Sequence, residues 1–169
     1  MNMKYVLALV FLSATQASAH GVADNHLQIM VVDNRIKMNI VVDMRVLAIA
    51  DADTDGYASL DELAARSHEI KEWVSQSFKV SDSSGEPGSI VFADVTSDLN
   101  IASAKDGKVD HARILQTLAF PGPVTDLKVD LEQVARLVPE LRVTIIDAAT
   151  GLRYKLRDPR TAQTITLPT

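Results

Sequence analysis

The chain has 169 residues, no cysteine, 17 basic against 22 acidic side chains and a formal net charge of -5. Hydrophobic residues make up 47% of it, the composition of a folded globular domain rather than of a disordered chain. The lack of cysteine excludes disulfides, thiolate zinc sites and a cysteine nucleophile. No basic tract is large enough to follow a phosphate backbone, so nucleic acid is not expected as a partner.

The first 19 residues predict a secretory signal peptide. Lys4 precedes the apolar run from Tyr5 to Leu12, and the small residues Ala-Ser-Ala at 17–19 supply a cleavage site. The apolar run is shorter than the roughly 20 residues that a membrane-spanning helix needs, and no later segment is longer. We therefore expect cleavage after Ala19, a mature chain from His20 to Thr169 without a membrane span, and a periplasmic or secreted location.

Apolar residues recur at every second position from Leu27 to Met44, on both sides of the dipeptide Asp33-Asn34. A period of two with many β-branched residues is typical of strands, and the dipeptide is typical of a tight turn. The pattern predicts a β-hairpin.

The segment from Leu60 to Phe78 has a different period. Apolar residues are spaced by threes and fours, with Glu, Lys, Arg and Ala between them. This pattern predicts one long amphipathic helix that buries a single face. The residues on that face are Leu60, Leu63, Ala64, Ile70, Trp73, Val74 and Phe78.

Short strand patterns separated by turns fill the rest of the chain. They cover residues 79–80, 90–95, 124–131, 141–147, 152–156 and 164–167, and Asp106-Gly107 is expected to close a hairpin between Ile101 and Leu115. The predicted fold is mainly β: a single β-rich, sandwich-like domain over residues 20–169, with a loop and an α-helix inserted at 51–78.

The inserted loop carries the one motif with a defined chemistry. Five acidic residues and no basic residue lie within 51–62, which read DADTDGYASLDE. Asp51, Asp53 and Asp55 alternate along a tight turn, and Glu62 follows at the start of the predicted helix. Alternate carboxylates that converge on one side of a turn suit a hard cation, which prefers six to eight oxygen ligands.

Further residues of the loop fit the same site. Gly56 permits the positive φ that the turn needs. The backbone carbonyl of Tyr57 and the hydroxyl of Ser59 could complete the shell around one calcium ion. The loop resembles the calcium-binding loop of the EF-hand family, which implies Ca2+ as the cofactor and Asp51, Asp53, Asp55, Tyr57, Ser59 and Glu62 as its ligands.

Two departures from a paired EF-hand set further expectations. The strand pattern that ends near Val42 leaves room for only a short helix or a strand end before the loop. Ala58 stands where the family usually has a β-branched residue that pairs with a second hand, so we expect a single, unpaired loop. A second resemblance concerns the mature chain. The hairpin HLQIMVVDNRIKMNIVVDM, the acidic loop, DELAAR at the start of a helix and the β-rich remainder resemble, more weakly, the soluble extracytoplasmic region of HupE/UreJ-type membrane proteins, which implies a free-standing periplasmic version of that domain.

Alternative interpretations remain for several residues. Ser59 and Glu62 also form the sequence pattern of a helix capping box, so the acidic loop could simply cap a helix in a periplasmic interaction module linked to metal handling, with an envelope protein as partner. His20 at the mature N-terminus could contribute to a copper site. His68 and Glu72 are expected to form a solvated pair, and His111 to lie on the surface. No catalytic motif is found, so an enzyme is not expected.

Overall fold

The computed structural model describes residues 25–44, 46–97, 108–138 and 140–168. The predicted signal peptide, its cleavage site, His20 and the turn Asp106-Gly107 lie outside these residues.

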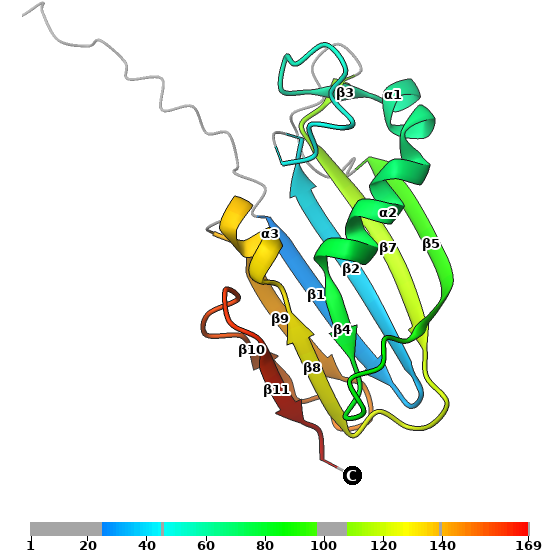
Figure 1. Cartoon of the computed structure of the whole chain (residues 1–169), viewed down its shortest axis with the longest axis vertical. Helices are drawn as coiled ribbons and strands as arrows, with labels where there is room; N and C mark the ends of the chain where they lie inside the picture. Colours follow the sequence, from blue (N-terminus) through cyan, green and yellow to red (C-terminus); the bar gives the residue numbers. More distant parts are fainter. Residues whose placement is uncertain (1–24, 45, 98–107, 139, 169) are drawn as a thin grey trace, which may run out of the picture.

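A six-stranded sheet forms the larger layer of the fold (Figure 1). In spatial order its strands are β10 (Arg153–Lys155), β9 (Arg142–Asp147), β1 (His26–Val32), β2 (Arg35–Asp43), β7 (His111–Ala119) and β5 (Ser89–Ser97). β1 and β9 run parallel, and the other neighbouring strands run antiparallel. The predicted hairpin is confirmed, because Val32 pairs with Arg35 across the turn at Asp33-Asn34.

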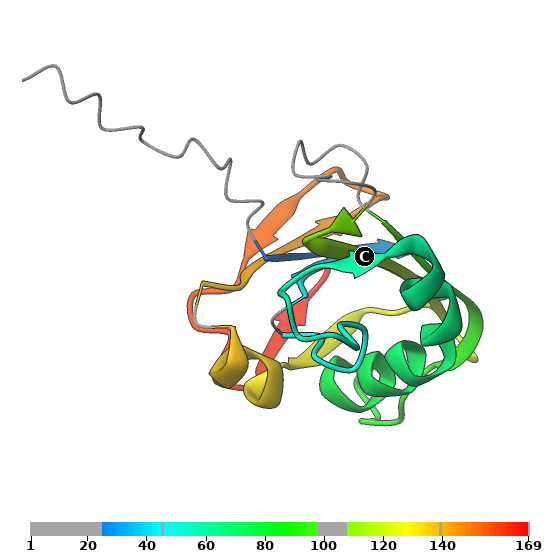
Figure 2. The same cartoon turned by 90° about the horizontal axis from the view of Figure 1, so that it is seen from above.

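The second layer combines a helix with a smaller sheet. Helix α2 (Ser67–Ser77) leads through Phe78 into β4 (Lys79–Ser81), which pairs with β8 (Asp126–Asp130), and β8 pairs with β11 (Gln163–Thr166). Both parts lie over the same face of the larger sheet, as the two perpendicular views show (Figures 1 and 2). The prediction of a mainly β domain is therefore confirmed, with a helix replacing part of the second layer.

The core lies between these layers. Strand residues alternate between buried and accessible positions in β1 and β7, as the period-two pattern predicts. Ile29, Ile40 and Ile145 contribute fully buried side chains from the large sheet, and Ile70 and Leu127 contribute them from the second layer. One continuous apolar cluster therefore joins the two layers.

The helical prediction needs two corrections. The segment 60–78 forms two helices, α1 (Leu60–Ala65) and α2, because Arg66 leaves helical geometry at φ -100° and ψ 8°. A third helix, α3 (Glu132–Leu137), occupies a segment for which no helix is predicted. The sequence features that favour this helix are weak: Glu132 and Arg136 form an ion pair one turn apart, and two adjacent residues are buried.

A two-stranded ladder completes the fold beside α1. β3 (Ala58–Ser59) pairs with β6 (Lys108–Val109), so the end of the acidic loop is joined to the segment that leads into β7. This ladder places residues 51–59 at one end of the molecule (Figure 1).

Truncation of Ile40 tests the central position of β2. Ile40 is fully buried between β1 and β7, so Ile40→Ala should lower the free energy of unfolding by about 2–5 kcal/mol through lost burial and a residual cavity. Urea denaturation of Ile40→Ala and of Lys37→Ala, which changes an exposed residue of the same strand, measures the difference. Equal midpoints for the two variants would contradict this packing.

Candidate metal centre

The segment before the acidic loop is anchored by apolar burial and not by a helix. β2 ends at Asp43, and turns follow, with Val46 N–H donating to the Asp43 carbonyl at 2.9 Å and Ala50 N–H to the Leu47 carbonyl at 2.7 Å. Met44, Leu47 and Ala50 are all buried. Neither a short helix nor the strand end leads directly into the loop: β2 ends at Asp43, and the described residues before Asp51 form turns.

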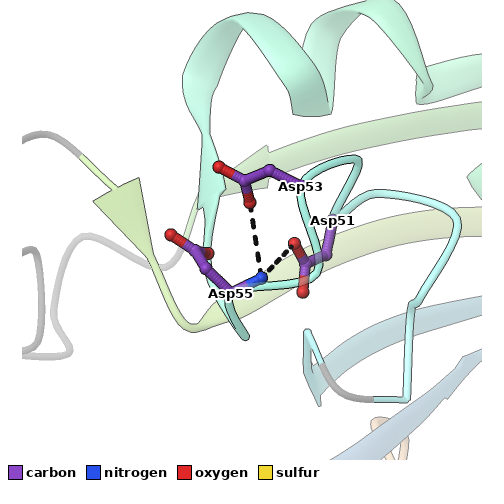
Figure 3. A group of neighbouring side chains, drawn as sticks. All are labelled: Asp51, Asp53 and Asp55. Atoms are coloured by element: carbon purple, nitrogen blue, oxygen red, sulfur yellow. Dashed lines mark hydrogen bonds between the residues drawn. The ribbon is translucent and has the colours of Figure 1, made fainter.

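Three aspartates converge at the centre of the loop. Asp51, Asp53 and Asp55 each place a carboxylate oxygen within 4.8 Å of the others, so the group could hold a metal ion (Figure 3). Asp51 is 7% exposed, whereas Asp53 and Asp55 are exposed to solvent. The cluster therefore has one fixed, buried carboxylate and two accessible ones.

Backbone amides of the loop orient these carboxylates. Asp51 accepts hydrogen bonds from Asp55 N–H at 3.1 Å and from Gly56 N–H at 2.8 Å, one on each oxygen. Asp53 Oδ1 also accepts from Asp55 N–H, at 3.4 Å (Figure 3). Asp55 Oδ1 accepts from Tyr57 N–H at 2.9 Å. The chain thus curls around the Asp51 carboxylate.

Two residues of this turn have left-handed backbone conformations. Gly56 has φ +84°, as the sequence predicts, and a side chain there would be strained by conformation alone, because no atom lies within 4 Å of a Cβ position. Thr54 has φ +58° although it is β-branched, a conformation that such residues rarely adopt. The tight curl of the loop therefore includes a strained residue beside its aspartates.

Glu62 lies apart from the three aspartates and caps α1. Its Oε2 accepts from Ser59 N–H at 2.7 Å and from the Ser59 hydroxyl at 2.8 Å, while Glu62 N–H donates back to Ser59 Oγ at 3.2 Å. This is a complete capping box. The hydrogen bonds from Ser59 hold the pKa of the Glu62 carboxyl below its usual range, because they favour the charged form.

A lysine from β6 lies against the aspartates. Lys108 Nζ is 2.7 Å from Asp53 Oδ2 and 2.7 Å from Asp55 Oδ2. Hydrogen bonding to the ammonium lowers the pKa of the Asp53 carboxyl, and the two carboxylates together raise the pKa of Lys108. A positive charge already lies on the open side of the cluster.

The expectation of a loop without a second hand stays a prediction, because residues 98–107 lie outside the described part of the chain, but the loop does have a backbone partner. Ala58 pairs with Val109, and Ser59 pairs with Lys108, so a small residue at this loop position does not prevent a ladder. Sequence patterns do not identify Lys108, because it is separated from Asp53 by 55 positions and only the β3–β6 pairing brings it near.

The remaining predicted residues have separate roles. Tyr57 follows the aspartates in the loop and donates its N–H to Asp55. His68 Nε2 lies 3.5 Å from Glu72 Oε1 on an exposed helix face, as expected of a solvated pair. The surface position expected for His111 is wrong: this side chain is buried, with Nδ1 2.9 Å from Asp110 Oδ1.

Comparison with known proteins does not assign the chain to a family. No protein-family model matches it, and a search of curated proteins finds no match. Among the described residues, no helix is both long and apolar enough to cross a membrane. The geometry of the loop is therefore the basis for any functional proposal.

Replacement of Ser59 tests the capping box. Ser59→Ala removes two hydrogen bonds of the Ser59 hydroxyl, the one that it accepts from the Glu62 N–H and the one that it donates to the Glu62 carboxylate. The variant should therefore destabilise the metal-free protein by about 1 kcal/mol. Thermal unfolding in EDTA measures the change, with Ser67→Ala as the matched control at the start of α2, where no side chain caps the helix. A loss equal to that of Ser67→Ala would exclude a stabilising cap.

Proposed function

We propose that this is an exported, non-enzymatic protein that binds one calcium ion through residues 51–62, in a structural or weakly sensing role. The observation that carries the proposal is the convergence of the Asp51, Asp53 and Asp55 carboxylates within 4.8 Å of one another. A signal-peptide pattern before His20 supports export, and the sequence resemblance to the EF-hand loop supports the choice of ion.

The donor set favours calcium over other metals. The three converging ligands are oxygens, and the chain has no cysteine for softer metals such as zinc or Cu(I). Mg2+ demands near-ideal octahedral geometry and keeps several waters, whereas Ca2+ accepts six to eight oxygens in flexible arrangements. A loop with one buried and two accessible carboxylates suits the more tolerant ion.

A complete calcium shell requires two local rearrangements. Glu62 would turn from Ser59 toward the aspartates, and the Lys108 ammonium would leave Asp53 and Asp55. The Tyr57 carbonyl and the Ser59 hydroxyl are the further proposed ligands. Because existing interactions are lost on binding, we expect an affinity on the order of micromolar to millimolar, the range of sensors and extracellular modules.

The role that follows is stabilisation of one end of the fold. A ligand that binds only the native state adds RT ln(1 + [L]/Kd), or about 2.7 kcal/mol at a free concentration 100 times Kd. The ion would link the segment that follows β2 to the start of α1, which are otherwise joined through the loop and the β3–β6 ladder.

A second candidate function is favoured by the same contacts. Glu62 caps α1, and Lys108 neutralises part of the aspartate charge. The carboxylates of the loop therefore have interaction partners without an ion. The protein would then be a periplasmic interaction module linked to metal handling, with an envelope protein as its partner. A measurement of calcium binding distinguishes the two candidate functions.

Loss of a loop carboxylate should weaken calcium binding. Asp51→Asn and Glu62→Gln each remove a proposed ligand charge, so isothermal titration calorimetry should show a loss of at least tenfold in calcium affinity, about 1.4 kcal/mol. Calcium should raise Tm in the parent protein and have little effect in either variant.

Asp61→Asn is the matched control, because it removes the same charge from an exposed neighbour that is not a proposed ligand. Parent-like affinity in Glu62→Gln would show that the glutamate remains a cap during binding. Absence of calcium binding by the parent protein at millimolar calcium would favour the interaction module.

Lys108 should compete with the ion. Lys108→Met removes the ammonium that lies between Asp53 and Asp55, so calcium affinity should increase severalfold and Tm in EDTA should fall. Calorimetry at low and moderate salt measures the effect, with Lys79→Met as a lysine control on β4. A weaker affinity in Lys108→Met would instead mean that the lysine organises the loop for binding.

A further inference from the structure

A cavity far from the acidic loop remains without a role in calcium binding. Its volume is about 660 Å3, within the range of small-molecule sites. It lies among the C-terminal end of α2, β4, the turn at 82–88 and the strands β5 and β7. It opens where the smaller sheet ends at β4 and the larger sheet ends at β5, so both edges of the fold border it.

The walls of the cavity are largely apolar. Phe78 and Val80 line it from the second layer, and Leu118 lines it from β7. These three side chains are buried members of the core cluster. Ile90, which also lines the cavity, is 50% exposed on β5, so apolar surface continues outward from the core. A hydrocarbon group placed there would be removed from water.

One buried polar side chain has unused bonding capacity at this cavity. Gln116 is 3% exposed, and its Nε2 donates to Ser75 Oγ at 3.2 Å. The Ser75 hydroxyl donates in turn to the Lys71 carbonyl at 2.9 Å, which leaves Ser75 as the acceptor and fixes the orientation of the amide. No described residue donates to Gln116 Oε1. This oxygen is not among the fully buried side-chain atoms that lack a partner, so it is accessible from the cavity and can accept a hydrogen bond from a bound molecule.

Charge is also arranged around the cavity. Lys79 and Lys128 line it from β4 and β8, and neither forms an ion pair with a described residue. Asp130 is the one acidic lining residue, so the described lining has a net positive charge. The cavity therefore offers an apolar wall, an amide oxygen that is open to a ligand donor, and two ammonium groups.

We propose that this cavity binds a small amphipathic carboxylate that carries a hydroxyl group near its charged end. The hydrocarbon part contacts Phe78, Val80 and Leu118, and the carboxylate lies beside Lys79 and Lys128. The hydroxyl donates to Gln116 Oε1. This inference is independent of calcium, because none of these residues belongs to the acidic loop.

The test uses β-hydroxydecanoate and decanoate as matched probes, titrated into the full chain in EDTA below their micelle-forming concentrations. Trp73 is the only tryptophan, and its ring centroid lies 5.7 Å from that of Phe78, so its fluorescence reports on the cavity wall. Both probes should change Trp73 fluorescence and raise Tm. The hydroxylated probe should bind severalfold more tightly, because its hydrogen bond to Gln116 Oε1 replaces one to water.

Three variants locate the site. Gln116→Leu should remove the preference for the hydroxylated probe while decanoate still binds. Lys128→Met should lower the affinity for both probes severalfold and reduce the dependence of their binding on salt concentration. Lys155→Met, at an exposed lysine of β10 on the opposite edge of the large sheet, should leave both affinities unchanged.

Two results would overturn the proposal. The first is no change in fluorescence or Tm with either probe at millimolar concentration. The second is binding that Gln116→Leu and Lys128→Met leave unaltered, which would place the probes elsewhere. If Gln116→Leu fails to fold, the double variant Lys79→Met/Lys128→Met tests the proposal instead, because both lysines are exposed and their replacement should not prevent folding. Unchanged affinity for both probes in this variant would overturn the proposal.

Discussion

Burial of the C-terminal half of β2 is the constraint on which the rest of the structure depends. Val41, Val42 and Asp43 are buried, and β2 pairs along its length with β1 and β7. The apolar residues that follow, Met44 and Leu47, continue the same core up to Asp51. The start of the acidic loop is therefore held by the core of the sheet rather than by a preceding helix.

Local features of the fold could be predicted from the sequence, and long-range ones could not. The hairpin at Asp33-Asn34, the left-handed Gly56 and the Ser59–Glu62 cap depend on a few adjacent residues, so their patterns are visible in the chain. The parallel pairing of β1 with β9 and the approach of Lys108 depend on contacts between distant segments. The sequence does not predict the break at Arg66, because the helical spacing of apolar residues continues across it. It does not predict α3 either, because a helix of six residues is too short to show a clear helical periodicity.

The loop combines two opposed electrostatic arrangements. Three carboxylates at short range repel one another, and the hydrogen bonds of Asp51 and the ammonium of Lys108 offset that repulsion in the metal-free protein. The same contacts lower the affinity that a cation would otherwise have for the cluster. These contacts fit the weakly sensing role proposed for the loop, and without Lys108 the loop should depend more on a bound cation for its stability.

The parallel pairing of β1 with β9 has a consequence for how the chain folds. His26 pairs with Arg142, and Val31 pairs with Asp147. The large sheet is therefore complete only when segments more than a hundred residues apart in the sequence have come together. The entropy cost of bringing these distant segments together precedes the contacts that they form, which makes folding slow. The first half of the chain cannot complete its sheet alone. During synthesis it would remain incomplete until strand β9 has emerged, which agrees with the export proposed for this protein.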